Sequence, residues 1–452
     1  MVNLVFKAYD IRGVFKEQID ENFAYSLGIT LGKKYKNILV GNDVRIGSKE
    51  LIRPFVYGLI ESDAKVSYAG TISTPLMYFG TKNNYDLGVI LTASHNPPEY
   101  TGFKMCDKKA IPISPIDEIK PMFKEHKLNE IQKKEIREID LDKLKVDIIT
   151  DYKKFFLNRC TNCDKKIAVD FANGSTAIVE KDILENILPN HIFINDYPDG
   201  TFPAHQPDTL KKSCLVDIIN TVKNENCDMG VIFDGDGDRI GIIDEKGNVL
   251  QGDILTVLIA IEILKEKNKT KTKNKDGIKI VYDLRCSKIV PETIEKYGGI
   301  PIKTRVGHYF IKKLMHEVDA EFAGELSNHF YFKEVGYFES PLLALNYLLC
   351  AMEDMRKPLS ELSKEYKKYF HSGEINFKVK DQKLIMNELK NKYSKCKIEE
   401  IDGVSIYCDN WWCNVRPSNT EPLLRLNLEA NTEELMNKKI EEIKTIIEEL
   451  NG

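Results

Sequence analysis

The sequence lacks the short motifs of several large enzyme classes. It contains neither G-x-G-x-x-G nor G-x-x-x-x-G-K-[S/T], so dinucleotide binding and P-loop hydrolysis lose their main support. No G-x-S-x-G turn surrounds Ser94, which weakens an esterase interpretation.

Long apolar runs are also missing. No window approaches about 18 uninterrupted apolar residues, which argues against a membrane-spanning helix. The first residues, MVNLVFKAYDIRG, do not have the cationic segment and the long apolar segment of a signal peptide. We therefore expect a cytoplasmic protein without a membrane partner.

Cysteines are scattered rather than clustered. Of the ten, only Cys160 and Cys163 form a C-x-x-C pair, and no second pair stands at zinc spacing. In a chain without an export signal, this pattern predicts reduced and mostly buried thiols. A redox or metal-binding role for the pair is the weaker alternative.

An excess of positive charge is absent as well. The formal net charge of −4 argues against a nucleic-acid-binding surface, although local groups of Arg and Lys can still bind phosphate. Charged residues make up 30% and hydrophobic residues 42%, which is typical of a globular protein. A chain of 452 residues predicts roughly three domains of about 150 residues each.

Short apolar segments alternate with helical patterns along most of the chain. Between two strand-like segments, residues 48–60 have helical periodicity, with Ser48 as the expected N-cap and Pro54 as the expected weak point. Residues 166–171 and 227–233 repeat the strand pattern in a second unit. This succession favours parallel or mixed α/β sheets.

Changes in composition and element order mark the boundaries. The highly charged segment from Lys124 to Lys145 suits a junction between domains, and roughly the last 80 residues have an α+β order. We predict three similar α/β domains and a smaller α+β domain, with the boundaries 1–148, 149–251, 252–370 and 371–452.

Three carboxylates at alternate positions form the clearest chemical signal. Asp234, Asp236 and Asp238 are separated by glycines, so their oxygens can converge on one point. Such clustered negative charge favours a hard cation, and open coordination positions suit Mg²⁺ bound to a phosphate. The alternative is an acidic β-turn without a metal.

A serine follows a predicted buried strand. The apolar segment 87–91 leads into Thr92–Pro97, and Asn96 and Pro97 then end regular structure. We predict that Ser94 presents its hydroxyl on a tight, exposed turn at the carboxyl end of the strand. An ordinary turn is the equal alternative for this segment taken alone.

Basic groups that could bind phosphate occur at several distant points. Arg12 and Lys104 are two of them, whereas Asp43 and Arg45 are as well explained by a local ion pair. The loop Arg416–Pro422 offers a guanidinium, two hydroxyls, an amide and backbone N–H groups, which are the donors that a phosphate dianion needs.

The segment Gly324–His329 carries further polar groups. Glu325, Ser327 and His329 alternate, so an extended backbone would place them on one side, where they suit sugar hydroxyls. The alternative is a polar strand edge. Taken alone, His308 is more readily explained as a structural histidine than as a catalytic one.

Taken together and in this order, these motifs resemble the α-D-phosphohexomutase family, and within it the bacterial phosphomannomutase/phosphoglucomutases. The resemblance spans almost the whole chain, from Tyr9–Gly13 to Arg416–Pro422. It implies four domains around a central cleft, three related α/β domains with mixed sheets and a smaller α+β domain.

The resemblance also implies a reaction. Phosphoryl groups would move reversibly between C1 and C6 of mannose and glucose phosphates, through phosphorylated Ser94 and a hexose 1,6-bisphosphate that also serves as activator. Mg²⁺ would bind Ser94, Asp234, Asp236 and Asp238, and Arg239 would contact the phosphoserine. The further roles that it implies are catalytic for Arg12, His95, Lys104 and His308, and substrate-binding for Arg285, Glu325, Ser327, His329, Arg416, Ser418, Asn419, Thr420 and Arg425.

Among the catalytic residues, Lys104 and His308 are the acid–base candidates. His95 is expected to contact phosphate or substrate rather than to act as the base for Ser94, since adjacent side chains diverge in an extended turn.

Two positions depart from the family pattern. Asn328 stands where glycine is usual before the histidine, and Asn tolerates left-handed backbone angles. Arg285 stands where bacterial relatives commonly have Lys, which changes how a phosphate is held. Leu326, between Glu325 and Ser327, favours mannose and glucose phosphates over glucosamine phosphate, which remains the second choice.

Two other functions compete with a mutase. A Mg²⁺-dependent phosphatase would need no second phosphate loop, and a sugar-phosphate sensor would not need an intact catalytic set. The expected partners are therefore small sugar phosphates, and both a monomer and a dimer are compatible with the sequence.

Overall fold

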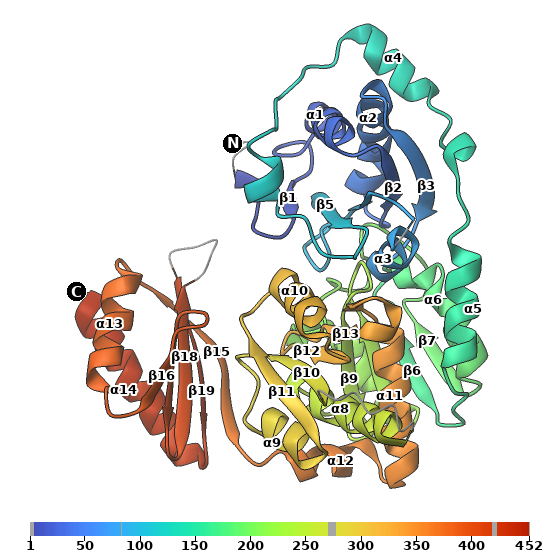
Figure 1. Cartoon of the computed structure of the whole chain (residues 1–452). Coiled ribbons are helices and arrows are strands. Elements are labelled where there is room, and N and C mark those ends of the chain that lie inside the picture. The colour runs from blue at the N-terminus through green and yellow to red at the C-terminus, as the bar shows by residue number, and fades with distance from the viewer. Residues whose placement is uncertain (1–3, 83, 270–276, 418–422, 452) are drawn as a thin grey trace.

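The computed structural model describes residues 4–82, 84–269, 277–417 and 423–451. The described chain forms four sheets, each with its own helices (Figure 1). In that view, the sheet of β1–β5 lies above the sheets of β6–β9 and β10–β14, and the sheet of β15–β19 lies to the left. We call these four parts the first, second, third and fourth units.

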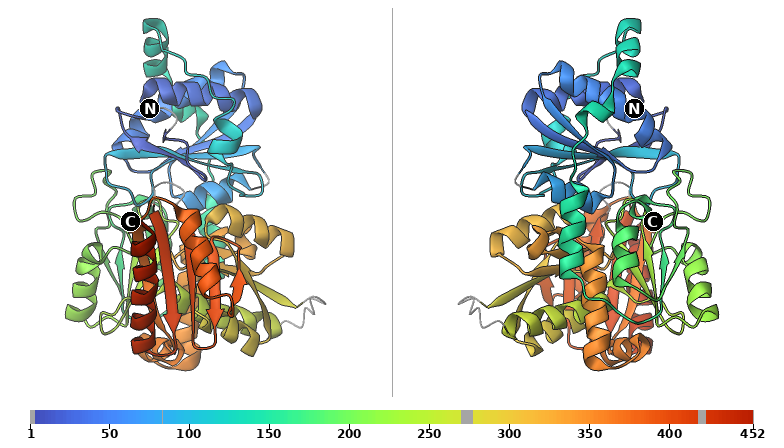
Figure 2. Two further views of the ribbon diagram at one scale, coloured as in Figure 1. Left: turned by 90° about the vertical axis from the view of Figure 1, so that its left-hand side faces the viewer. Right: turned by 90° about the vertical axis from the view of Figure 1, so that its right-hand side faces the viewer.

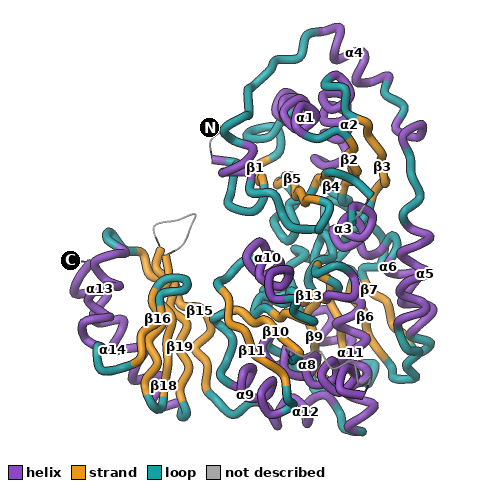
Figure 3. The backbone as a smooth tube through the Cα atoms, viewed as in Figure 1, coloured by secondary structure: helices purple, strands orange, loops and turns teal. Residues whose placement is uncertain are grey.

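The first unit holds a five-stranded sheet in the order β1-β5-β4-β2-β3. Its elements are β1 (Ile11–Val14), α1 (Glu21–Lys34), β2 (Asn37–Asn42), α2 (Ile46–Glu61), β3 (Lys65–Thr71), α3 (Thr74–Thr81), β4 (Leu87–Leu91) and β5 (Tyr100–Asp107). A long connection containing α4 (Glu130–Glu138) then runs along one side to the second unit (Figure 3).

The second unit has four strands in the order β7-β6-β8-β9. Its elements are α5 (Ile149–Arg159), β6 (Ile167–Asp170), α6 (Glu180–Ile187), β7 (His191–Ile194), α7 (Val216–Asn224), β8 (Met229–Phe233) and β9 (Ile240–Asp244).

The third unit has five strands in the order β11-β10-β12-β13-β14. Its elements are α8 (Gly252–Lys269), β10 (Ile278–Asp283), α9 (Ile289–Lys296), β11 (Gly299–Thr304), α10 (His308–Val318), β12 (Phe322–Gly324), β13 (Phe330–Phe332), β14 (Phe338–Glu339), α11 (Pro341–Met355) and α12 (Leu359–Tyr366).

The fourth unit is an antiparallel sheet in the order β15-β19-β18-β17-β16. Its helices cover the face that points away from the third unit (Figure 1). Its elements are β15 (Phe370–Lys378), α13 (Gln382–Lys392), β16 (Lys397–Glu399), β17 (Val404–Cys408), β18 (Trp411–Pro417), β19 (Leu423–Ala430) and α14 (Glu433–Asn451).

The first three units share one strand pattern. In β3-β2-β4-β5, β7-β6-β8-β9 and β11-β10-β12-β13, three parallel strands are followed by an antiparallel fourth. The turn into that fourth strand carries residues 92–99, 234–239 and 325–329, respectively. The three predicted chemical loops are therefore equivalent positions of a repeated fold, and the α/β prediction is confirmed.

The hydrophobic cores show how tightly the units are joined. One continuous core includes Phe233 of the second unit, Leu258 of the third and Tyr78 of the first. The core of the fourth unit contains only its own residues, from Val379 to Ile447. Side views show this unit against one flank of the others (Figure 2). The fourth unit is therefore held to the rest mainly by polar contacts.

Three local predictions are corrected by the fold. Helix α2 begins at Ile46 after Arg45, so Ser48 is not its N-cap, and α2 continues through Pro54 without a break. Cys396 and Cys408 form a disulfide, because the antiparallel register of β16 and β17 places them opposite each other. The eight other cysteines are free thiols, and six of them are buried. Within the described residues, no helix has both the length and the apolar character needed to cross a bilayer.

Candidate active site

The backbone turn that carries Ser94 is held by hydrogen bonds from the buried side chain of Arg45. Arg45 donates to the carbonyl oxygens of Ser94 and Asn96, each at 2.6 Å, and to that of Pro97 at 2.7 Å. Its Nε lies 3.2 Å from Asp43, and both side chains are fully buried. The ion-pair interpretation of Asp43 and Arg45 is therefore right, and the pair shapes the loop that carries the serine.

Ser94 lies inside the molecule rather than on an exposed turn. Its exposed fraction is 1%. The Oγ atom donates to Asp234 Oδ2 at 2.9 Å and lies 3.2 Å from His95 Nδ1. The predictions of an exposed turn and of a diverging His95 are wrong, because a left-handed φ of 53° at Ser94 turns the backbone away from the extended form.

His95 is held in its neutral form. Arg239 is the largest cause that lowers the pKa of His95 well below its usual value, followed by burial and Arg12. A neutral imidazole beside a serine hydroxyl can accept a proton, so the structure leaves His95 able to do more than bind phosphate.

The three aspartates converge as predicted. One ligand oxygen from each of Asp234, Asp236 and Asp238 lies within 4.8 Å of the others, and all three residues are buried. Oδ1 of Asp236 and Oδ1 of Asp238 have no hydrogen-bond partner among the described residues. Burial, and then Asp238 and Asp236, raise the pKa of Asp234 well above its usual value. Bare oxygens and crowded negative charge fit a divalent cation.

Lys104 already offsets part of this charge. Its Nζ donates to Asp236 Oδ2 at 2.6 Å and to Asp238 Oδ2. Burial alone would lower the pKa of Lys104, but Asp236 and Asp238 outweigh it and raise the pKa. Lys104 is therefore a fixed ammonium group inside the cluster.

Thr74 is a contact that the sequence did not reveal. As the first residue of α3, it donates its backbone N–H to the carbonyl oxygen of Asp236 at 2.8 Å and its hydroxyl to Asp236 Oδ2 at 2.6 Å. The N-terminus of α3 thus supports a carboxylate of the second unit. In the sequence, Ser73-Thr74-Pro75 indicates only the start of a helix and does not predict a distant hydrogen-bond partner.

Arg12 and Arg239 approach the same place from different units. Arg12 donates to Asp10 at 2.7 Å and to the side chain of Asn96 at 2.9 Å. The backbone N–H of Arg239 donates to Asp234 Oδ1 at 3.1 Å. Both guanidinium groups contribute to the lowered pKa of His95.

The loop of residues 325–329 is a tight turn, so the prediction of an extended segment is wrong. The Asn328 N–H donates to the carbonyl oxygen of Glu325 at 3.0 Å, and Asn328 has a left-handed φ of 68°. The expectation that Asn can replace glycine here is confirmed. Ser327 Oγ and Glu325 Oε2 each lie 3.1 Å from His329 Nδ1, so the turn still gathers the predicted side chains.

His329 links this loop to the loop of residues 234–239. Its Nε2 lies 3.5 Å from Asp238 Oδ1 and 3.1 Å from Arg239 Nε. Burial and Arg239 would lower its pKa, but Asp238 and Glu325 raise it to about 9. These contacts connect the second and third units.

His308 begins α10 and faces a buried carboxylate. Its Nδ1 lies 3.8 Å from Glu339 Oε1. Burial, followed by Lys312 and Lys104, lowers the pKa of His308 well below its usual value. The lowered pKa leaves the imidazole of His308 neutral, so that it can accept a proton.

A second cationic group lies between the third and fourth units. Arg285 bonds Asp283 at 2.8 Å and lies 3.3 Å from Glu325. Arg416 and Arg425 both contact Glu374, and burial followed by Arg285 lowers the pKa of Arg416. Of the predicted binding residues, Ser418, Asn419 and Thr420 lie outside the described part of the chain.

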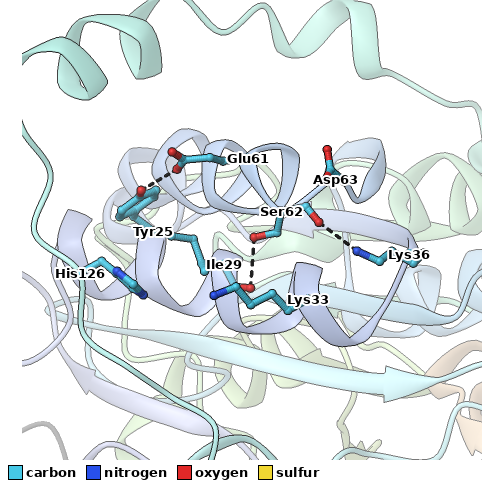
Figure 4. Close-up of a pocket in the computed structure, with 8 residues that line it drawn as sticks. All are labelled: Tyr25, Ile29, Lys33, Lys36, Glu61, Ser62, Asp63 and His126. Atoms are coloured by element: carbon cyan, nitrogen blue, oxygen red, sulfur yellow. Dashed lines mark hydrogen bonds between the residues drawn. The ribbon is translucent and has the colours of Figure 1, made fainter.

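The hollow drawn in Figure 4 lies elsewhere. It is bounded by α1, α2 and the segment near His126, and none of the predicted site residues lines it. Its lining includes Lys33 and Lys36 together with Glu61 and Asp63, so it favours neither charge. The predicted site residues lie instead in and around the loops at the strand ends.

Comparisons with known proteins agree with this geometry. Four models of phosphoglucomutase/phosphomannomutase domains match: α/β/α domain I at residues 3–130, domain II at 146–247, domain III at 251–369 and the C-terminal domain at 374–446.

Individual relatives match over nearly their whole length. A phosphomannomutase of Methanocaldococcus jannaschii is 70% identical over 451 residues, covering 99% of this chain and 98% of the relative. A phosphomannomutase/phosphoglucomutase of Pseudomonas aeruginosa is 31% identical, covering 98% and 94%. The crystal structure of a phosphoglucomutase/phosphomannomutase family protein from Burkholderia thailandensis matches with a TM-score of 0.86 at 25% identity, covering 100% and 98%. The chain belongs to the phosphoglucomutase/phosphomannomutase family, within the α-D-phosphohexomutases.

Proposed function

We propose that this protein interconverts the 1-phosphates and 6-phosphates of mannose and glucose. Family membership supports a hexose phosphate mutase, which is an isomerase. The observation that carries the proposal is the division of the site. Ser94 contacts a carboxylate cluster at one end, and three arginines of two other units gather at the other.

The part of the site that contains Ser94 and the carboxylate cluster, which we call the reacting end, suits phosphoryl transfer from Ser94. Asp234, Asp236 and Asp238 would hold Mg²⁺ together with an oxygen of the phosphoserine. When bound, Mg²⁺ neutralises charge on the phosphoryl group as it is transferred. Arg12, Arg239 and Lys104 add positive charge around the same group, which stabilises a charged transition state.

The proton balance assigns acid–base roles. A sugar hydroxyl oxygen forms the new bond to phosphorus as the bond from Ser94 Oγ breaks. The hydroxyl proton passes to a neutral imidazole, for which His308 is the first choice, and Ser94 Oγ takes up one proton from solvent in return. Lys104, an acid–base candidate from the sequence, has a raised pKa that suits it to stabilise charge on the departing oxygen rather than to donate this proton. The lowered pKa of His308 keeps its imidazole neutral, so it can take up a proton, but it also makes this imidazole a weak base.

The part of the site that contains the three arginines, which we call the gripping end, would hold the phosphate that is not reacting. Arg285, Arg416 and Arg425 supply charge, and the loop residues Ser418, Asn419 and Thr420 would supply hydroxyl and amide donors. Glu325, Ser327 and His329 would hold the sugar hydroxyls. The resulting hexose 1,6-bisphosphate turns around within the site, so that its two phosphates exchange positions. The phosphate that was not reacting is then transferred to Ser94. Two phosphate sites are unnecessary for a phosphatase, which supports the mutase.

The decisive experiment compares three sugars. Purified protein with Mg²⁺ and a trace of glucose 1,6-bisphosphate should convert mannose 1-phosphate and glucose 1-phosphate to their 6-phosphates, and glucosamine 1-phosphate more slowly. Release of inorganic phosphate equal to substrate loss would support a hydrolase instead. A faster rate with glucosamine 1-phosphate would overturn the mannose and glucose specificity while keeping the mutase.

A further inference from the structure

A carboxylate lies among the cations that we assign to the non-reacting phosphate. Glu374 of β15 accepts a hydrogen bond from Arg416 Nη2 at 2.7 Å through Oε2. Its Oε1 lies 3.3 Å from Arg425 Nη1. The two guanidinium groups therefore share one carboxylate, although both would be needed to bind a dianion.

A β-bulge directs Glu374 to this position. The pairing of β15 with β19 changes register between His371 and Glu374, where Gly373 has a left-handed φ of 70°. Within the bulge, Ser372 Oγ accepts the N–H of Leu428 at 2.9 Å. An extra residue in one strand changes the face to which the following side chains point. The irregularity thus places an acidic side chain on the arginine face.

The register confirms that the three side chains share this face. Arg416 pairs directly with Arg425 across β18 and β19, and Glu374 pairs with Asn427, two residues beyond Arg425. Directly opposed residues, and residues two apart in a strand, point to the same side of a sheet. Two like charges that oppose each other destabilise a sheet unless an opposite charge intervenes, and Glu374 supplies that charge.

The partial exposure of these side chains allows a phosphate to exchange with the carboxylate of Glu374. The side chains of Glu374 and Arg425 are 27% and 28% exposed, whereas that of Arg416 is 9% exposed. The ion pair can therefore rearrange at the surface of the site without opening a core. A phosphate that approaches from this side meets Glu374 together with the arginines.

We propose that Glu374 competes internally with the sugar phosphate for Arg416 and Arg425, and so keeps the distal phosphate exchangeable. This rests on the proposed function, in which both ends of the bisphosphate must occupy the site in turn. A phosphate must share the guanidinium groups with the carboxylate or displace it, and the two anions repel each other. Binding is weakened and release is accelerated.

The test replaces the carboxylate by an amide of the same shape. Glucose 1,6-bisphosphate is titrated calorimetrically into Ser94→Ala protein with and without Glu374→Gln, at fixed ionic strength with Mg²⁺. Removal of the negative charge should tighten binding about tenfold, as expected for charge-assisted contacts. In protein with Ser94 intact, Glu374→Gln should lower KM and also kcat.

Matched variants separate charge from structure. Glu388→Gln removes a carboxylate from the exposed face of α13 and should leave binding unchanged. Glu374→Asp keeps the charge and should bind more like the wild type. Thermal unfolding of each variant checks the fold.

The possible outcomes are distinct. Unchanged or weaker binding by Glu374→Gln would overturn the competitor role, and weaker binding would show that Glu374 positions the arginines instead. A wild-type protein that does not convert hexose phosphates would contradict the proposed function. Conversion without tighter binding by the variant would contradict only the role of Glu374.

Discussion

The two ends of the site are built differently. At the reacting end, Ser94 and Lys104 are 1% and 4% exposed, and their hydrogen bonds run from the first unit to the second. At the gripping end, Arg425 and Glu374 are partly exposed, and their ion pair lies within the fourth unit. The reacting end is enclosed, whereas the gripping end combines buried Arg285 and Arg416 with the more accessible Arg425 and Glu374.

Among the described residues, polar contacts join the third and fourth units beside the gripping end. His371 Nε2 lies 3.1 Å from the carbonyl oxygen of Arg285, and Glu429 accepts the N–H of Lys288 at 3.1 Å. Because the fourth unit has its own hydrophobic core, it can shift by exchanging such polar contacts. The reacting end cannot open without breaking buried hydrogen bonds between the first two units. This difference suits a reaction in which one phosphate is transferred and the other must be released and regripped.

The largest effect is expected at the reacting end. Ser94→Ala removes the residue that we propose to carry the phosphoryl group and should reduce kcat by at least about 10³-fold, as for loss of a nucleophile. The variant should remain folded, since alanine carries the same Cβ as serine at this left-handed φ and loses mainly the hydrogen bond to Asp234. Steady-state kinetics and thermal unfolding measure the two effects. Ser213→Ala, at an exposed position, is the control, and full activity of Ser94→Ala would contradict the assignment.

A smaller effect is expected at the gripping end. Arg425→Gln removes one charged donor and should raise KM about tenfold, with a smaller change in kcat, since a charge-assisted hydrogen bond contributes about 1.5–3 kcal/mol. Initial rates across a range of mannose 1-phosphate concentrations separate the two constants. Lys438→Gln, which removes an exposed charge from α14, should change neither. A fall in kcat with constant KM would show that the grip acts on the chemical step, and the contrast between the ends would fail.

The smallest effect on catalysis is expected from a change at Glu180, which is buried next to the start of α3. Glu180 accepts a hydrogen bond from Ser73, which precedes Thr74, and lies 3.3 Å from the Tyr152 hydroxyl. Burial raises the pKa of Glu180 to about 7. Because the folded protein retains this proton and the unfolded chain loses it near pH 4.5, stability should fall as the pH rises from about 4.5 to 7.

Glu180→Gln should abolish this part of the pH dependence. Its stability relative to wild type should increase by up to about 1.4 kcal/mol per pH unit within that window. Denaturant unfolding at pH 5 and pH 8 measures the change, with Glu185→Gln on the exposed face of α6 as the control. Equal pH profiles for wild type and Glu180→Gln would show that Glu180 is charged in the folded protein.

The loops were predictable because each carries its chemistry in a short segment. The three aspartates fall at alternate positions directly after an apolar strand, so local spacing already brings their oxygens together. Ser94 follows a similar strand, and the repeated strand–helix pattern predicted the α/β units. Asn328 was expected to take a left-handed conformation, and it does.

Other features depend on contacts between distant residues. The contact of Thr74 with Asp236 spans 162 positions, and nothing in a helix start names such a partner. The pairing of Cys396 with Cys408 needed the register of a hairpin, and that of Glu374 with two arginines needed a bulge. His95 turned toward Ser94 because of one positive φ, whereas the prediction assumed an extended backbone.

The sequence by itself determined which groups are available: a serine, three carboxylates and separate clusters of cations, each at the end of a local element. Residue type and periodicity fix such elements because side-chain direction repeats every two or 3.6 residues. The tertiary structure alone decided which groups meet. It enclosed Ser94 and Lys104 with the aspartates, and it left Glu374 between two arginines at an accessible edge. Burial and long-range packing set the charge state and mobility of each group, and neither is encoded in local spacing.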